Sequence, residues 1–372
     1  MNQLSHRDRV LLAINNKPVD RIPFDFGSHP NASIHVEAYE KLKAYLGIQS
    51  HTRVMHRWMQ VAEVDEAILC LFNIDTRRLS LGSRDNQLER DLDNTTYVDQ
   101  WGVVRRKPAG ALYYELVHCP LAGEISIHDI VNYPWPDPND PGITRDLRYR
   151  AASLKNISDY AIVLTLPSAF LHTSQFIRGF EDWYLDCATR PVLLETLFDA
   201  VLEVNLETVR GVLRDVGDMV DIVVTADDIG DQRGIITSPV MYRRLIKFRQ
   251  KKYFDEIHRL TSAKLVYHTC GSVIEVLEDL IEIGVDVLNP VQTSAKGMDP
   301  QTLKRKAGAH LAFWGGVDTQ RLLCQGSCAD ISREKETLIR ILGEGGGFVL
   351  APAHNIQPDV PPENICELFM RR

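Results

Sequence analysis

The chain has 372 residues, of which 44% are hydrophobic and 25% charged, the usual mixture for a folded globular protein. This composition excludes a disordered chain, a collagen-like chain and a small disulfide scaffold. The formal net charge of −8 argues against a nucleic-acid partner. No apolar run approaches the ~18–20 residues that a membrane span needs. The first ten residues hold no signal-peptide core, and the seven cysteines are scattered, so we expect a cytoplasmic protein with reduced thiols.

Eight short runs have the composition of β-strands, and most end in polar or glycine-rich residues. Helical periodicity separates several of them, as in 191–213, 238–259 and 272–283. Alternating strands and helices predict a parallel sheet, and eight such units predict an α/β fold of the (β/α)8 TIM-barrel class, formed by residues 1–372 as a single domain. The runs are 21–26, 75–81, 161–166, 221–226, 264–268, 285–289, 311–314 and 347–351.

The alternation is interrupted once, by about eighty residues between the second and third runs. Within this stretch, 95–104 and 112–117 have the pattern of antiparallel hairpin strands, and 133–141 is a proline-rich connector that cannot continue a helix or a central strand. We therefore predict that residues 84–160 are an insertion in the barrel, placed after its second strand.

Polar residues at the carboxyl ends of the runs are the candidates for a functional site, because barrel enzymes place their active sites at this end. His268 and Cys270 alternate along a strand, so both side chains can face one point. Histidine nitrogen and cysteine thiolate are zinc ligands, and a catalytic zinc usually takes three protein ligands. His354, after the last run, is the candidate third ligand. The alternative is a satisfied histidine beside a buried thiol.

Two adjacent carboxylates, Asp227 and Asp228, follow the fourth run. Adjacent side chains at a strand end diverge, so only one of them can face the centre of the pocket. That residue would be a general acid or base, or an acceptor for substrate. The alternative is a helix or loop cap, with Arg233 neutralising the carboxylate. Arg233 is the only obvious cation near these strand ends.

Several segments of the chain resemble the uroporphyrinogen decarboxylase superfamily, which contains true decarboxylases and corrinoid-dependent methyltransferases. The resemblance implies a single (β/α)8 barrel and spans most of the chain outside the insertion. It is carried by RVLLAINNKPVDRIPFDFG, TADDIGDQRGIITSPVMYRR, VYHTCGSVIEVLEDLIEIGVDVLNPVQ, FWGGVDTQ and FVLAPAHNIQPDVPPENI.

The resemblance is nearer to the methyltransferase branch. The decarboxylases carry an arginine-bearing segment early in the chain, whereas residues 24–29 here read FDFGSH. The methyltransferases hold zinc with a His-x-Cys pair and a distant cysteine. His268 and Cys270 match the pair, and His354 stands where the distant cysteine is expected. The tail around His354 also resembles the decarboxylases, so His354 alone does not choose the branch.

The resemblance implies a methyltransferase component that moves a methyl group between a small methyl ether, thioether or methylamine and a corrinoid (cobalamin), for example in O-demethylation. Zinc at His268, Cys270 and His354 would be the Lewis acid, and Asp227 or Asp228 would manage the proton. No Asp-x-His-x-x-Gly pattern is evident, so the corrinoid would belong to a partner protein. The sequence allows a homodimer. The expected substrate-binding residues are Asp25, Gln232, Asn289, Gln292 and Asp318.

Two alternatives stay open. One is a metal-independent decarboxylase of the uroporphyrinogen decarboxylase type, acting on a smaller or differently charged acid. The other is a non-catalytic protein that binds a tetrapyrrole or a corrinoid. Zinc content separates the first alternative from the methyltransferase, and cobalamin binding without turnover would favour the second.

Overall fold

The computed structural model describes residues 3–86, 89–157 and 159–370. Its centre is a curled, seven-stranded parallel sheet in the order β14-β13-β12-β11-β10-β9-β4, so that neighbouring strands follow one another along the chain. Seven of the eight predicted runs form these strands. They are β4 (Thr76–Leu79), β9 (Ala161–Thr165), β10 (Ile222–Ala226), β11 (Lys264–His268), β12 (Val287–Asn289), β13 (Ala312–Val317) and β14 (Phe348–Pro352).

The remaining run, 21–26, lies between the two edge strands of this sheet but forms only an isolated parallel bridge, from Phe24 to Leu350 of β14. The backbone N–H of Asp25 donates to the Leu350 carbonyl at 2.9 Å, and the N–H of Asp75, just before β4, donates to the Phe24 carbonyl at 2.9 Å. Pro23 has no N–H to donate, which limits the regular ladder that the segment can form. The prediction of a full strand here is therefore wrong.

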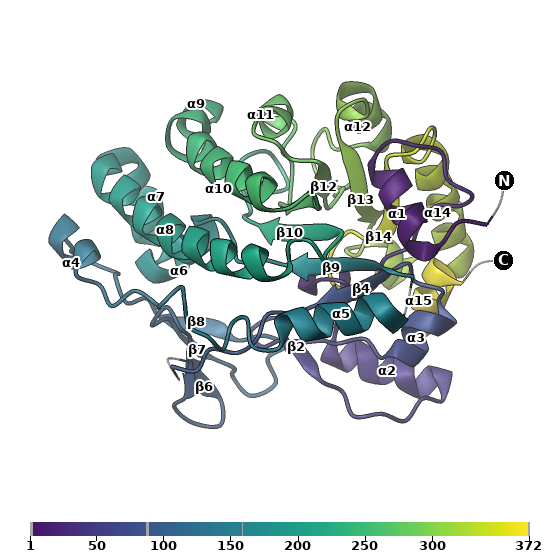
Figure 1. The fold of residues 1–372 in the computed structure, drawn as a ribbon, viewed down its shortest axis with the longest axis horizontal. Helices are drawn as coiled ribbons and strands as arrows, with labels where there is room; N and C mark the ends of the chain where they lie inside the picture. The colour runs from purple at the N-terminus through teal and green to yellow at the C-terminus, as the bar shows by residue number, and fades with distance from the viewer. Residues whose placement is uncertain (1–2, 87–88, 158, 371–372) are drawn as a thin grey trace.

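Helices surround the curled sheet (Figure 1). The predicted helix 191–213 is confirmed as α8, with Pro191 at its first position. The predicted helix 238–259 is confirmed as α9, a π-helical turn (Tyr242–Ile246) and α10. The helices are α1 (His6–Ile14), α2 (Val36–Leu46), α3 (Glu66–Leu71), α4 (Ile127–Val131), α5 (Leu147–Ile157), α6 (Leu171–Arg178), α7 (Phe180–Thr189), α8 (Pro191–Val216), α9 (Pro239–Met241), α10 (Lys247–Leu260), α11 (Leu277–Glu282), α12 (Pro300–Ala307), α13 (Leu322–Gln325), α14 (Cys328–Leu342) and α15 (Pro362–Phe369).

The predicted helix 272–283 is wrong in its first half, because α11 begins only at Leu277. The backbone N–H of Ser272 donates to the Asp231 carbonyl at 2.7 Å, and the Ser272 hydroxyl donates to the Lys296 carbonyl at 2.6 Å. These bonds to two neighbouring loops hold the segment outside a helix. None of the described helices combines the length with the apolar character that crossing a bilayer would take.

The interior of the curled sheet is filled by small and branched side chains together with Trp314. Val10 and Ile14 of α1 pack against this interior cluster, so α1 covers the amino end of the strands. Figure 1 shows α1 at one end of the sheet, while β9 and β10 point to the opposite side, where β6, β7 and β8 lie. The sheet residues of the cluster are Ala161, Val163, Ile222, Val224, Val266, Val287, Ala312, Trp314, Val349 and Ala351.

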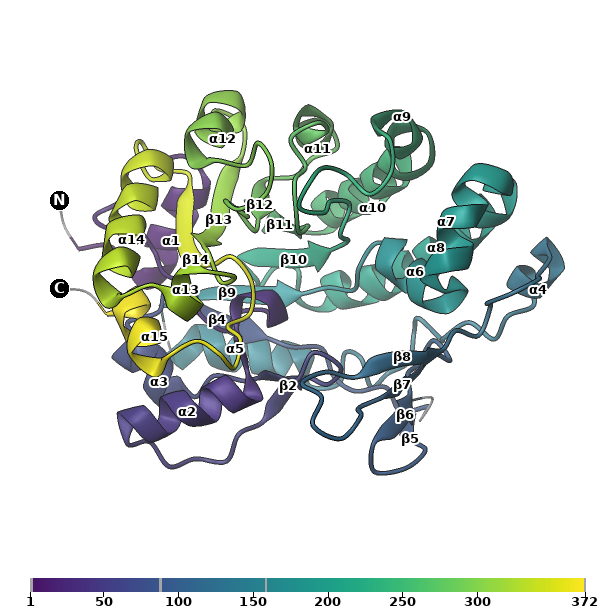
Figure 2. The ribbon, with the colours of Figure 1, turned by 180° about the vertical axis from the view of Figure 1, so that it is seen from behind.

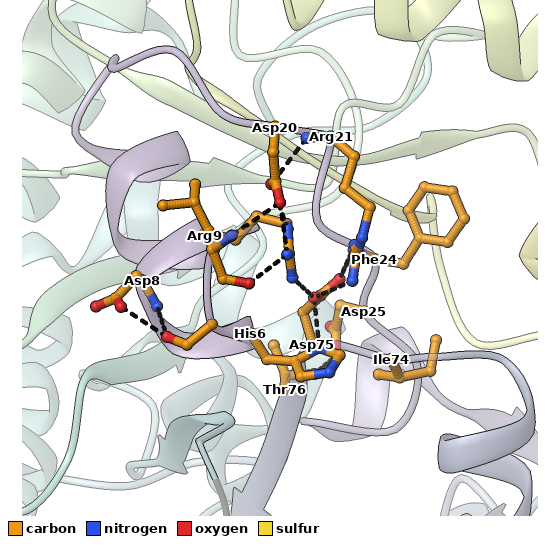
Figure 3. A network of polar contacts seen from close by, with 12 residues as sticks. His6, Asp8, Arg9, Asp20, Arg21, Phe24, Asp25, Ile74, Asp75 and Thr76 are labelled. Atoms are coloured by element: carbon orange, nitrogen blue, oxygen red, sulfur yellow. Dashed lines mark hydrogen bonds and ion pairs between the residues drawn. The ribbon is translucent and has the colours of Figure 1, made fainter. Parts of the chain in front are cut away.

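A charge network fixes α1 to the amino end of the sheet (Figure 3). Its centre is Asp75, which is fully buried immediately before β4. This carboxylate accepts hydrogen bonds from Arg9 at 2.8 Å and from Arg21 at 2.8 Å, and it lies 2.7 Å from Nδ1 of His6. Arg9 also pairs with Asp20 at 2.7 Å. We call these five residues the amino-end network.

Two smaller antiparallel sheets lie beside the main one. One is three-stranded and contains β1 (Ile34–His35), β2 (Val54–His56) and β3 (Val61–Ala62). The other is four-stranded and contains β5 (Arg90–Asp91), β6 (Thr96–Val98), β7 (Val104–Arg106) and β8 (Glu115–His118), on the side of the molecule away from α14 and α15 (Figure 2). These four strands fall within the predicted insertion 84–160, whose limits stay a prediction. Near its end, α5 packs on β4 and β9 as part of the helical layer.

Candidate metal centre

Three potential metal ligands meet at the carboxyl end of the main sheet. His268 is the last residue of β11, Cys270 follows two residues later, and His354 follows β14. Their ligand atoms all lie within 4.8 Å of one another. His268 Nε2 is 3.4 Å from Cys270 Sγ, and the rings of His268 and His354 are 5.7 Å apart between centroids. The structure therefore brings together the three side chains that the sequence analysis selected as ligands.

The spacing of these atoms fits zinc. With zinc–nitrogen bonds of about 2.0 Å and zinc–sulfur bonds of about 2.3 Å, neighbouring ligand atoms of a tetrahedral site lie about 3.5 Å apart. The separation of 3.4 Å between His268 Nε2 and Cys270 Sγ matches this value. The other separations are within 4.8 Å, so a small closure onto one ion would give three protein ligands and leave a fourth position open.

Asn289 holds the His268 ring in the form that a metal needs. Its side-chain N–H donates to the Trp314 carbonyl at 3.1 Å, so its Oδ1 atom faces His268 Nδ1 at 2.5 Å. Since Oδ1 can only accept, Nδ1 carries the proton and Nε2 presents its lone pair toward Cys270. Such a partner fixes the tautomer and orientation of a metal-binding histidine. Sequence reasoning expected Asn289 to bind substrate, a role that stays a prediction.

Burial controls the protonation of the three candidate ligands. It lowers the pKa of His268 to about 4 and also lowers the pKa of His354, so both imidazoles are neutral near pH 7. Burial and the nearby Asp228 carboxylate raise the pKa of the Cys270 thiol well above its ordinary value. A bound cation reverses this preference, because a thiol that coordinates metal gives up its proton.

The two adjacent carboxylates point in different directions, as expected for neighbours at a strand end. Asp227 is fully buried and accepts the backbone N–H groups of Phe170 at 3.2 Å and His172 at 3.0 Å, at the start of α6. Asp228 accepts the N–H of Cys270 at 2.7 Å and lies 3.4 Å from Nε2 of His172. Asp227 therefore caps a helix, and Asp228 is the carboxylate that borders the candidate metal centre.

His172 is a partner of Asp228 that the sequence analysis did not select. Burial opposes protonation of His172, but the Asp228 carboxylate outweighs it and raises the pKa of the ring. Burial opposes ionisation of Asp228, but the contact with His172 and the hydrogen bond from the Cys270 N–H outweigh burial and hold the pKa of Asp228 well below its ordinary range. Arg233, expected to neutralise one of the two aspartates, is exposed in the loop after them, where its backbone N–H donates to Asp231.

The remaining predicted substrate-binding residues lie at different depths. Gln292 and Asp318 line a cavity of about 170 Å³ together with Cys270 and His354. Gln232 lies at the exposed rim, where its side chain donates to Gln320 at 2.9 Å. These positions leave their roles in substrate binding as predictions.

Asp25, the fifth of these residues, is fully buried inside the sheet. Its carboxyl group accepts hydrogen bonds from Thr76 at 2.6 Å, Ser28 at 2.8 Å and the Trp314 indole at 3.0 Å. Burial outweighs these bonds and raises the pKa of Asp25 to about 6. Its predicted contact with substrate stays a prediction.

Gly271 shapes the loop that carries Cys270. Its backbone has φ = 80°, and a Cβ atom there would lie 2.4 Å from the Asp231 carbonyl oxygen, so only glycine fits. The Gly271 N–H donates to Gln292 Oε1 at 2.7 Å. The glycine and its partner therefore fix the position of the Cys270 thiol relative to the strand ends.

His29 is a second histidine that sequence reasoning missed. It is fully buried, its ring lies edge-on to His268 at 6.3 Å between centroids, and neither ring nitrogen has a hydrogen-bond partner among the described residues. His29 follows the first predicted run, so the rule that selected the other strand-end residues could also have selected it. No local pattern marks His172, because its role depends on the packing of α6 against the end of β10.

Comparison with known proteins places the chain in a family. The family described as "Uroporphyrinogen decarboxylase (URO-D)" matches residues 158–371, which is more than half of the chain. The protein therefore belongs to the uroporphyrinogen decarboxylase family, as the sequence motifs indicated.

Its relatives lie in both branches of the superfamily. The methylcobamide:CoM methyltransferase MtaA of Methanosarcina barkeri is 28% identical over 152 residues, 41% of each chain. A uroporphyrinogen decarboxylase of Serratia proteamaculans (strain 568) is 30% identical over 185 residues, 49% of this chain and 47% of the relative. The chain thus matches less than half the length of these relatives. A solved methyltransferase from Methanosarcina mazei shares the fold, with a TM-score of 0.70 and 18% identity over 98% of this chain and 97% of that chain.

Proposed function

We propose that this protein is a methyltransferase component that moves a methyl group between a small methylated substrate and a corrinoid carried by a separate protein. The observation that carries the proposal is the convergence of His268, Cys270 and His354, with Asn289 turning the His268 lone pair toward Cys270. The likeness to a methylcobamide:CoM methyltransferase supports it.

The contacts of Phe24 with β14 and Asp75 support a closed (β/α)8 barrel. The free thiols of all seven cysteines support a cytoplasmic location.

In the demethylating direction, the bond between the methyl carbon and a substrate oxygen, sulfur or nitrogen breaks. The electron pair of that bond stays on the heteroatom, and the methyl carbon forms a new bond with the reduced cobalt of the corrinoid, which supplies the electron pair. Zinc held by His268, Cys270 and His354 would supply Lewis-acid stabilisation of the heteroatom. Asn289 fixes His268 for this role, and Gly271 fixes Cys270.

We assign the proton of the reaction to the pair formed by Asp228 and His172. Asp228 touches the backbone of Cys270 and lies 4.0 Å from His268 Nε2, so it borders the position of the heteroatom. The pair can hold a proton on His172 Nε2, 3.4 Å from the carboxylate. Asp227 acts indirectly, because both N–H groups it accepts belong to the start of α6, which carries His172. Asp25, Gln232, Gln292 and Asp318 remain candidates to orient the substrate.

The test combines metal analysis with a methyl-transfer assay. Purified protein should hold about one zinc per chain, and Cys270→Ala should lower both zinc retention and methylation of reduced cobalamin. The matched control is Cys328→Ala, which removes a cysteine of α14 and should change neither quantity. The methyl donors are a panel of ethers, thioethers and methylamines. Absence of zinc after growth in zinc-supplemented medium, with no methyl transfer from any donor, would contradict the proposal.

A metal-independent carboxy-lyase is the second candidate, and the likeness to uroporphyrinogen decarboxylases favours it. Decarboxylation of a porphyrinogen or a smaller acid at an enzymatic rate, unaffected by a chelator and by Cys270→Ala, would establish this activity in place of methyl transfer. Cobalamin binding without turnover in either assay would instead establish a non-catalytic corrinoid-binding protein.

A further inference from the structure

Arg78 of β4 projects into the interior of the curled sheet. Two residues earlier on the same strand, Thr76 donates its hydroxyl to Asp25 at 2.6 Å, and Asp25 accepts the indole N–H of Trp314 in the interior cluster. Alternate residues of a strand face the same side, so Arg78 faces the interior as Thr76 does. Because it stands further along the strand, it lies nearer to the carboxyl end, where the metal centre is.

The guanidinium of Arg78 differs from that of its neighbour on the same strand. Arg77 is satisfied by Glu66, which accepts from its Nε atom at 2.8 Å and its Nη2 atom at 2.7 Å. The Nε atom of Arg78 is buried and has no hydrogen-bond partner among the described residues. Burial lowers the pKa of Arg78, because the loss of water around the guanidinium outweighs the attraction of the Glu63 carboxylate. Buried donors of this kind are rare in folded proteins.

Two further basic side chains accompany Arg78. Arg105 of β7 is 4% exposed, its Nε atom also lacks a hydrogen-bond partner within the described part of the chain, and its ion pair with Asp99 spans 3.6 Å. His56 of β2 has a buried Nδ1 atom without a partner in the same ranges. Burial, followed by the charges of Arg105 and Arg78, lowers the pKa of His56 to about 4. Trp58 links two of these groups, because its ring lies 5.3 Å from the His56 ring and 5.1 Å from the Arg105 guanidinium. The charge of Arg78 acts on the same His56 ring.

This basic cluster borders the metal centre through aromatic contacts. The guanidinium of Arg105 lies 4.4 Å from the centroid of the Phe176 ring, and Phe176 stacks on His172 at 5.8 Å between ring centroids. His172 in turn faces Asp228 beside Cys270. The side chains of His172 and Asp228 are 28% and 32% exposed, so solvent reaches the pair that lies between Phe176 and Cys270.

We propose that Arg78, Arg105 and His56 bind a single anionic group, a carboxylate or a sulfonate, on the methylated substrate. Paired N–H donors of a guanidinium match the oxygens of such a group. With its anionic end held there, the substrate would extend its methyl-bearing heteroatom past His172 toward the metal centre. The inference rests on the proposed function and adds the substrate class. Arg78 and Arg105, in place of Arg233, are then the cations near the site. The carboxylates of Asp99 and Asp228 limit the negative charge that the site can accept.

The first experiment compares methyl donors in matched pairs, each with a neutral compound and an acid of the same type. The pairs are anisole and 3-methoxybenzoate, and dimethyl sulfide and 3-(methylthio)propanoate. In the active pair, kcat/KM for the acid should exceed that for its neutral partner by about 10-fold to 100-fold, the usual effect of a charged hydrogen bond. Arg78→Gln and Arg105→Gln should remove this preference, chiefly by raising KM. Arg233→Gln, which changes an exposed arginine, should keep it.

The second experiment measures binding without turnover. Each acid and its neutral partner are titrated calorimetrically into the wild-type protein and into Arg78→Gln and Arg78→Lys, with zinc content and thermal unfolding showing that each variant is folded and loaded. The anion site predicts that the acid binds the wild type at least 10-fold more tightly than its neutral partner. Arg78→Gln should remove this advantage, and Arg78→Lys should restore part of it.

The two experiments separate the failure of the inference from that of the proposed function. Methyl transfer in which neutral donors equal the acids, or in which Arg78→Gln keeps the preference, would overturn the anion site and leave the methyltransferase standing. If no donor is demethylated, the proposed function fails and calorimetry alone decides the anion site. Equal binding of every acid and its neutral partner to the wild type would then overturn the inference.

Discussion

Buried titratable side chains are bonded differently at the two ends of the main sheet. At the amino end, Asp75 is fully buried and surrounded by Arg9, Arg21 and His6, which all contact its carboxylate. At the carboxyl end, His29 and Arg78 hold buried nitrogen atoms that have no hydrogen-bond partner among the described residues. We interpret the difference as one between a region that stabilises the fold and a region that binds a ligand.

The physical reason is the cost of desolvation. A buried polar group that finds no partner costs about 1–3 kcal/mol of stability. The amino end avoids this cost by pairing its charges, which also fixes α1 against the strands (Figure 3). At the carboxyl end the unpaired groups lower the stability of the fold. We infer that a substrate or metal supplies their missing hydrogen-bond partners when it binds. Substitutions at the two ends should therefore change different properties of the protein.

The largest effect on stability is expected at the amino end. Asp75→Asn removes the carboxylate that compensates Arg9 and Arg21 and should lower the free energy of unfolding by about 3–5 kcal/mol, since it leaves buried charges uncompensated. Urea unfolding followed by circular dichroism measures this change. The matched control is Asp218→Asn, which breaks an exposed pair with Arg148 and should cost less than about 1 kcal/mol. Equal effects of the two substitutions would remove the claim that the network stabilises the fold.

The same network predicts how stability depends on pH. Burial alone would raise the pKa of Asp75, but its bonds with His6 and Arg21 outweigh burial and lower the value to about 2. In an unfolded chain the pKa of aspartate is about 3.9. The stabilisation by this carboxylate is therefore fully present above about pH 4 and is lost as the pH falls toward 2, a change of about 2–3 kcal/mol. Unfolding of the wild type and Asp75→Asn at a series of pH values should show their difference shrinking over this range. A constant difference would contradict the pairing.

The two adjacent aspartates at the carboxyl end should separate stability from activity. Asp227→Ala removes the cap of α6 and should cost about 1 kcal/mol. Asp228→Asn should slow methyl transfer by about 100-fold or more, because it removes the charge that holds a proton on His172. Thermal unfolding and kcat are measured for both variants. If Asp227→Ala lowers kcat more than Asp228→Asn does, the roles assigned to them are reversed.

The smallest change in stability, and one of opposite sign, is expected at His29. His29→Leu replaces a buried imidazole without hydrogen-bond partners in the described structure by an apolar side chain of similar size. The free energy of unfolding, measured by chemical denaturation, should stay equal or rise by up to about 1 kcal/mol. A loss of stability as large as that for Asp75→Asn would show that His29 is part of the structural core.

Much of the fold was predictable because it is local in the sequence. Seven apolar runs became strands, and alternation along β11 followed by the loop at Cys270 identified His268 and Cys270. The structure of the eighth run, 21–26, depends on its two neighbours in the fold, because Phe24 contacts both β14 and the N–H of Asp75. Pro23 has no N–H to donate to a neighbouring strand. The start of α11 was missed because bonds from Ser272 to distant loops outweigh the helical pattern.

The missed parts of the site depend on contacts between distant segments. Arg105 belongs to β7, far from the strand ends in sequence, and approaches the metal centre only because it packs on Phe176 of α6. Arg78 stands in a run whose apolar character is weak, and the state of its guanidinium depends on which carboxylates the fold leaves near it. Composition and periodicity do not show which charged side chains the fold brings together. From the sequence, Arg233 was therefore the only cation expected near the strand ends.

X-ray absorption at the zinc edge of the purified, zinc-loaded protein shows whether His268, Cys270 and His354 hold zinc. We predict a single sulfur neighbour at about 2.3 Å and nitrogen neighbours at about 2.0 Å, with the sulfur signal lost in Cys270→Ser and unchanged in Cys328→Ser. A protein that retains no zinc, or a spectrum with only oxygen and nitrogen neighbours in the wild type, would contradict a metal centre at His268, Cys270 and His354.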